Sequence, residues 1–169
     1  MNRRKLETLL LTLESTPALL ARAVADLSPS EVNRKPQGGG FSFLENVWHL
    51  ADLEREAYGA RIRRILTEEE PSLSDFDGDR VARERRYNER DLAEGLIAFT
   101  QARALNVEAL RRAGRLQWKR RATQEGVGRV TLEDVPKQMV CHDASHTRDV
   151  RDLLSHLRDG TPYQQEQSA

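Results

Sequence analysis

Hydrophobic residues recur every three to four positions along most of the chain, which is the spacing of one face of an α-helix. The pattern predicts four long helices, over about residues 2–26, 42–66, 80–113 and 131–159. No segment shows an alternation that convincingly predicts a strand, and no internal repeat is present. Four helices with apolar stripes indicate an all-α fold, a four-helix bundle.

Local signals set the expected ends and breaks of these helices. Ser42 and Glu45 have the spacing of a capping box, and the segment at 28–31 predicts a short helix that begins at Pro29. Pro17 is expected to kink or divide the first helix, because proline lacks the backbone N–H of a helix interior. We expect an interruption of the third helix near Asn88.

Two of the connections are long. The polar segment 67–79 could span almost 40 Å at about 3.3 Å per residue, so the second and third helices need not be antiparallel. Segment 115–130 is long for a structureless loop, and connections of this length are often lids or binding loops. Trp118 gives this segment something to bury, but its sequence leaves open whether it is a lid.

Composition narrows the class of protein. The 169 residues fit one domain, which we place at 1–160, with a disordered tail expected at 161–169. A hydrophobic fraction of 38%, with no apolar run of about 20 residues and no signal peptide, predicts a cytoplasmic protein without a membrane span. The net charge of zero argues against a nucleic-acid or membrane-surface partner, and a single cysteine, Cys141, excludes an internal disulfide framework.

Two histidines lie on the buried face of the last helix. At about 100° per residue from Leu132, His142 falls near −80° and His146 near −40°, among the apolar residues, whereas Cys141 falls on the opposite face. Residues four apart lie about 6 Å apart along the axis, so both imidazoles could bind one ion. A buried histidine is more often a hydrogen-bonded core residue, and this pair becomes a specific metal signal only with a third donor.

The third donor is not settled by spacing. His156 lies too far along the helix to share an ion with the pair. His49 lies on a second face of the 42–66 helix, which could pack on another helix or on a second subunit. Arg103 is a further oddity at the centre of the apolar stripe of the third helix. It either pairs with an acid on a neighbouring helix or contacts an anionic group of a substrate.

Three segments together resemble the DinB/YfiT superfamily of candidate metalloenzymes. The resemblance covers about residues 5–157, and it implies an up-down-down-up bundle that is often a homodimer. It also implies that His49, His142 and His146 bind a divalent metal, and three neutral nitrogen ligands suit Zn, Ni or Fe. The segments that carry it are FSFLENVWHLADLE (41–54), LIAFTQARALNVEALRRAG (96–114) and TLEDVPKQMVCHDASHTRDV (131–150).

One position departs from the family pattern. The family often has Gln-Ile after the second histidine of the pair, where this chain has Asp149 and Val150. Asp149 is therefore a candidate for a contact to a ligating histidine or to a substrate, as is Arg103 for a substrate. Ligating histidines usually donate their other N–H to an acceptor, and Asp52 is a second candidate acceptor.

Three neutral imidazoles would leave the +2 charge of the ion free to activate a water or a thiol. The resemblance implies a thiol-dependent S-transferase that uses a low-molecular-weight thiol, or a hydrolase, acting on a small electrophile. The alternative is a non-catalytic binding or stress-related interaction protein with a structural metal or none. An open coordination position would favour the enzyme, and a closed site would favour the alternative.

Overall fold

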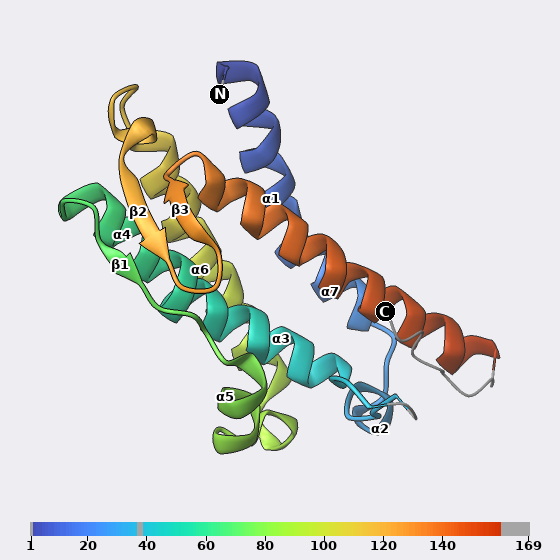
Figure 1. Cartoon of the computed structure of the whole chain (residues 1–169). Helices are drawn as coiled ribbons and strands as arrows, with labels where there is room; N and C mark the ends of the chain where they lie inside the picture. The colour runs from blue at the N-terminus through green and yellow to red at the C-terminus, as the bar shows by residue number, and fades with distance from the viewer. Residues whose placement is uncertain (1, 37–38, 160–169) are drawn as a thin grey trace.

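A computed structural model describes residues 2–36 and 39–159, and it confirms the four-helix bundle (Figure 1). The expected tail at 161–169 lies outside the described residues. The short helix α2 (Pro29–Val32) follows the first long helix. The long elements are α1 (Arg3–Val24), the continuous run of α3 (Phe43–Asp52), η1 (Leu53–Tyr58) and α4 (Gly59–Thr67), then α6 (Leu92–Arg112) and α7 (Asp134–Asp159).

Contacts between the helices give the up-down-down-up order. Gly95 lies against Trp48 and Gly59 lies against Asn106, so the α3–α4 run and α6 are parallel. Arg111 lies 3.7 Å from Glu7, and Arg103 donates to the carbonyl of Leu13, so α1 is antiparallel to α6. The imidazole of His146 contacts Asn46, and that of His142 contacts His49, so α7 is antiparallel to α3.

The helix starts agree with the sequence, but the expectation that Pro17 might divide the first helix is wrong. Ser42 and Ser28 both form complete capping boxes. Helix α1 runs through Pro17, whose missing N–H would have bonded the carbonyl of Leu13. That carbonyl accepts a hydrogen bond from Arg103 Nη1 at 2.9 Å instead, so a side chain of α6 replaces the lost backbone donor.

The segment expected as the third helix is divided as predicted. It comprises α5 (Gly78–Glu84), the short 3-10 helix η2 (Tyr87–Glu89) and α6. The second helix, in contrast, contains a π-helical turn, η1, that its sequence pattern did not indicate. π-Helical turns inside α-helices are frequent at functional sites.

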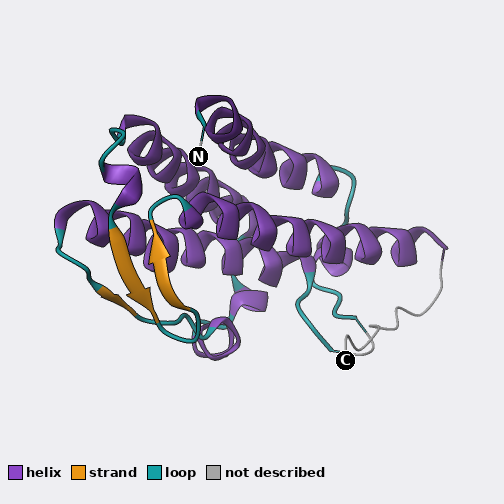
Figure 2. Cartoon of the chain, turned by 45° about the horizontal axis from the view of Figure 1, so that its top comes forward, coloured by secondary structure: helices purple, strands orange, loops and turns teal. Residues whose placement is uncertain are grey.

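A small sheet is the main departure from the sequence prediction. Segment 115–130 contains the 3-10 helix η3 (Gln117–Lys119), strand β2 (Arg121–Gln124) and much of β3 (Gly128–Thr131), which pairs antiparallel with β2. Strand β1 (Ser72–Leu73) pairs parallel with β2. The strands lie at one end of the bundle next to α4 (Figures 1 and 2), where Trp118 is buried. The segment is therefore a packed hairpin and not a structureless loop.

The core has two apolar clusters with polar groups among them. One cluster joins α4, the hairpin and the start of α7, and the other joins α3, α5 and the first half of α6. Arg103, Glu54 and Asp143 are buried in the bundle interior. Among the described helices, none combines the length and apolarity required to cross a bilayer.

Candidate metal centre

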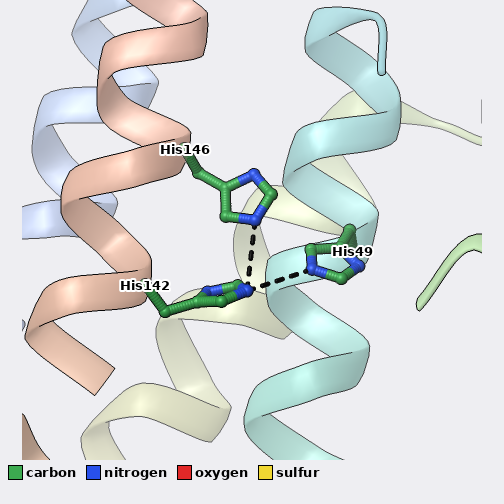
Figure 3. Close-up of side chains that lie close together, drawn as sticks. All are labelled: His49, His142 and His146. Carbon is green, nitrogen blue, oxygen red and sulfur yellow. Dashed lines mark hydrogen bonds between the residues drawn. The ribbon is translucent and has the colours of Figure 1, made fainter. Parts of the chain in front are cut away.

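Helix α3 delivers His49 to the bundle interior. All ten of its residues are buried, because the helix lies between α6, α7 and α5. His49 keeps only 7% of its surface exposed, and its ring faces the two histidines of α7 (Figure 3). The second face of this helix therefore packs inside the chain.

The three histidines converge through the same ring atom. The Nε2 atoms of His49 and His142 are 3.4 Å apart, and those of His142 and His146 are 3.2 Å apart. One ligand atom from each of the three lies within 4.8 Å of the other two. Two nitrogens bound to one tetrahedral ion at about 2.05 Å are about 3.3 Å apart, so the donor set fits a transition metal.

The orientation of His146 is fixed by an amide. Its Nδ1 lies 2.6 Å from Oδ1 of Asn46, and Nδ2 of Asn46 donates to the carbonyls of Ser42 and Phe41. Because the amide nitrogen is the donor to those carbonyls, Oδ1 must accept from the imidazole. Nδ1 of His146 therefore carries the proton, and Nε2 presents its lone pair to the other two rings.

The other two rings are positioned by packing. Nδ1 of His49 and Nδ1 of His142 are buried and have no hydrogen-bond partner among the described residues. A Cβ atom at Gly78, the first residue of α5, would lie 2.7 Å from Nδ1 of His49, so the glycine backbone is in close contact with that ring. The ring of Phe41 packs on the same imidazole with a centroid distance of 5.2 Å.

Burial keeps all three imidazoles in the neutral form that binds metals. Desolvation lowers the pKa of His49 to about 4, with a further contribution from the charge of His142. It lowers the pKa of His146 to about 2, again with help from the neighbouring imidazoles, and it also lowers the pKa of His142. Protons therefore do not compete with a cation for these nitrogens at neutral pH.

The carboxylates expected as acceptors for the histidines do not accept from the rings in the described structure. Asp149 makes no hydrogen bond to a ring and is half-buried, which raises its pKa. It lines a cavity of about 180 Å³ together with Asn46 and Asp79. Asp52 is fully buried, but it accepts from Arg55, Arg85 and Tyr87 and not from His49.

Arg103 forms a structural ion pair. Its guanidinium is 2% exposed and donates to both carboxylate oxygens of Asp143 at 2.6 and 2.8 Å. Its Nη2 also lies 2.9 Å from Glu54, whose carboxyl pKa is raised mainly by burial. The geometry supports the structural pair among the two interpretations of Arg103, since these acids and Leu13 occupy both terminal nitrogens.

Sequence reasoning missed Asn46 and Gly78. Asn46 lies one helical turn before His49, but nothing in the apolar pattern shows that α7 packs against it. Gly78 occurs in a polar connection, where a glycine usually indicates only a turn. Cys141 is exposed, as its wheel position predicted.

Comparison with known proteins gives consistent results. A sequence profile of the DinB superfamily matches residues 12–150. Three proteins named as inferred metal-dependent hydrolases are similar over part of the chain. They come from Oceanobacillus iheyensis (32% identity over 45% of this chain), Bacillus licheniformis (35% over 44%) and Bacillus subtilis (YfiT, 35% over 38%).

These sequence matches span 44%, 42% and 36% of the respective relatives, which is under half of their length. The solved structure of Bacillus subtilis YfiT superposes with a TM-score of 0.85 over 95% of this chain and 90% of that one, at 24% identity. It is described as a probable metal-dependent hydrolase with an unusual four-helix bundle topology. The likeness shows that the two chains share a fold.

Proposed function

Because this chain belongs to the DinB superfamily, we propose that it is a metal-dependent hydrolase whose divalent transition-metal ion is held by His49, His142 and His146. The convergence of three neutral Nε2 atoms carries the proposal. The described residues add no fourth His, Cys, Asp or Glu to this group, and three protein ligands with an open position are typical of catalytic sites. The names of the curated relatives support hydrolysis as the reaction.

When bound, the ion would supply Lewis acidity to an electrophile and lower the pKa of a water ligand. The protein's own contribution is to hold the three imidazole rings in the orientation that brings their Nε2 atoms together. Asn46 fixes His146, while Gly78 and Phe41 confine His49. We assign Asp149 to substrate contact, because it lines the same cavity as Asn46.

Metal analysis of the purified protein tests the site. We expect one transition-metal ion per chain, Zn, Ni or Fe, after purification or reconstitution, and its loss in His49→Ala, His142→Ala and His146→Ala. His156→Ala is the matched control, because this residue lies on α7 outside the cluster. A reconstituted wild-type protein without stoichiometric metal would refute the proposal.

A second assay distinguishes hydrolysis from the thiol-dependent S-transfer that the family resemblance implied. The metal-loaded protein is incubated with a small activated ester or alkyl halide, with and without a low-molecular-weight thiol, and the products are identified by mass spectrometry. Hydrolysis predicts an acid or alcohol product at a rate independent of the thiol. A thiol conjugate formed at a saturating rate would identify a transferase, and bound metal without turnover would favour the non-catalytic alternative. The homodimer and the cytoplasmic location stay predictions.

A further inference from the structure

Two arginines are buried among the residues whose burial the structure describes, and their terminal nitrogens have different partners. Arg103 has carboxylates or a carbonyl at both terminal nitrogens. Arg61, on α4, is 7% exposed, yet its one hydrogen bond among the described residues runs from Nη2 to the carbonyl of Ser74 at 3.1 Å. The Nε atoms of both arginines are buried without an acceptor among the described residues, so the two differ at their terminal nitrogens. A buried guanidinium with unused donors is energetically costly, so an anion that accepts from Arg61 would be favourable.

The groups around Arg61 compensate its charge only in part. The face of the Tyr58 ring lies 5.7 Å from the guanidinium carbon. Oδ1 of Asp75 is 3.8 Å from Nη2, but that side chain is 72% exposed, and such pairs are weak in water. Glu56 is nearby, but both of its oxygens accept from Arg85, at 2.7 and 2.9 Å.

A cavity of about 180 Å³ lies beside this guanidinium. Ala57, Ala60, Leu73 and Phe76 form its apolar lining, and Arg61 and Arg64 contribute cationic groups. Two carboxylates also line it, that of Glu56, which is paired with Arg85, and that of Asp75, which lies 3.8 Å from Arg61. At about 30 Å³ per water molecule, the volume accommodates about six non-hydrogen atoms. The unused Nε donor of Arg61 beside this apolar lining matches a single negative charge at the end of a short apolar stem.

The cavity is next to the candidate metal centre. The ring of Phe76 lies 6.2 Å from that of His49, centroid to centroid, and the ring of Tyr58 lies 6.2 Å from that of His142. The same two aromatic residues contact Arg61 or its cavity. One aromatic layer therefore separates the cavity from the three histidines.

We propose that this cavity is an anion-binding subsite in which Arg61 takes a carboxylate carried on a short apolar stem. The assignment of that carboxylate to a substrate rests on the proposed function, whereas the binding site itself does not. Arg61 would form a charge-assisted hydrogen bond to the carboxylate through Nε, which has no acceptor in the described chain. The subsite would favour anionic electrophiles over neutral ones of the same size.

Titration of metal-free protein tests the subsite without interference from anions that bind a metal. Butyrate, its neutral analogue butyramide and inorganic phosphate are added separately, and binding is followed by calorimetry and by amide chemical shifts. We expect butyrate to bind at least about tenfold more tightly than butyramide, because the amide lacks the charge. Tighter binding of phosphate than of butyrate would overturn the carboxylate assignment.

Two variants change the subsite in opposite directions. Arg61→Met should abolish butyrate binding, while Arg63→Met, an exposed position on the same helix, should leave it unchanged. Asp75→Asn removes the competing carboxylate from the surface and should tighten butyrate binding by about threefold, even if Arg61→Met does not fold. Unchanged affinity in Asp75→Asn, or butyrate binding retained in folded Arg61→Met, would overturn the subsite.

The outcome is independent of the metal proposal. Butyrate binding by a protein that takes up no metal would leave the subsite in place and refute the hydrolase. Stoichiometric metal binding without butyrate binding would refute the subsite and leave the metal site in place. The His142→Ala variant provides the same separation in one sample, because Arg61 lies on α4 and the lost imidazole lies on α7.

Discussion

A single amide side chain, that of Asn46, determines how one imidazole of the candidate metal centre is turned. Its Nδ2 is held by the carbonyls of Phe41 and Ser42, so its Oδ1 is a fixed acceptor for His146. Such partners of ligating histidines set both the tautomer and the orientation of the ring. The residue therefore belongs to the function of the site although it would not touch the ion.

Replacement of this amide should weaken metal binding without removing a ligand. We expect Asn46→Leu to lower the affinity for the metal by about 10–100-fold, since His146 loses the acceptor for its Nδ1 proton. Competition with a chromophoric chelator measures the effect. Asn33→Leu, at an exposed position, is the control. Equal affinities in the two variants would show that the amide does not orient the ring.

Gly78 is a second residue that does not bind the ion but is expected to affect a histidine that does. In Gly78→Ala the new methyl group would overlap the ring of His49, so that ring must move. We expect metal affinity to fall by about tenfold or more, comparable to the loss of a second-sphere contact. Gly114→Ala serves as the control, because a Cβ there meets only ordinary contact, at 3.5 Å. Unchanged chelator competition in Gly78→Ala would contradict this role.

Asn46 and Gly78 show which part of the site could not be inferred from the sequence. The spacing of His142 and His146 indicated a shared buried face, and the structure brings them together with His49. The partners Asn46 and Gly78 were not predictable, because each touches a residue of another element. The expected acceptors Asp52 and Asp149 were chosen by helical spacing, which says nothing about the neighbouring helix.

Between helices, the strongest polar connection is the buried cluster around Arg103. This α6 residue bonds Leu13 of α1, Asp143 of α7 and Glu54 of η1, and Asp143 also accepts from Thr16 of α1. Three helices and the π-helical turn therefore meet at one guanidinium. Its removal would leave two buried carboxyl groups without their cation.

We expect Arg103→Met to lower the free energy of unfolding by about 3–5 kcal/mol, because uncompensated buried charges are costly. Arg111→Met, which breaks a surface pair with Glu14, should cost no more than about 1 kcal/mol. Urea denaturation of both variants gives the two values. Similar losses would mean that the buried cluster adds no more stability than an exposed pair.

The elements that the sequence predicted well are those with long apolar repeats and clear caps. Helix α3 begins at its capping box, and α7 spans the expected range with Pro136 in its first turn. The hairpin was missed because strands β2 and β3 have four residues each, too few to establish an alternation. The π-helical turn was missed because its extra residue per turn depends on tertiary partners such as Asn106, which donates to the carbonyl of Glu54.

For the molecule as a whole, a bound ion would join two helices that pack less extensively than their neighbours. Helix α3 has far broader contact with α6 than with α7, yet its histidine faces the pair on α7. A metal that binds the folded chain alone stabilises it by about 2.7 kcal/mol at a free concentration one hundred times Kd. Metal occupancy is therefore expected to influence the stability of the entire bundle.

Chelation should reveal this coupling as a change in melting temperature. We expect the metal-loaded protein to melt about 5–10 °C above the metal-free form under that condition, as measured by calorimetry. The double variant His142→Ala/His146→Ala should melt at the same temperature with and without added metal. A wild-type melting temperature insensitive to saturating metal would contradict binding at the folded site.

Pro17 has a consequence for how the bundle assembles. The proline leaves the Leu13 carbonyl in the interior of α1 without its backbone donor, and Arg103 is the donor that reaches it. A slide of α1 by one helical turn, about 5.4 Å, would separate the two and leave the Leu13 carbonyl unsatisfied in the core. The missing backbone hydrogen bond at Pro17 thus helps to fix the register of α1 on α6. Only the observed alignment satisfies the Leu13 carbonyl, and other alignments are less stable.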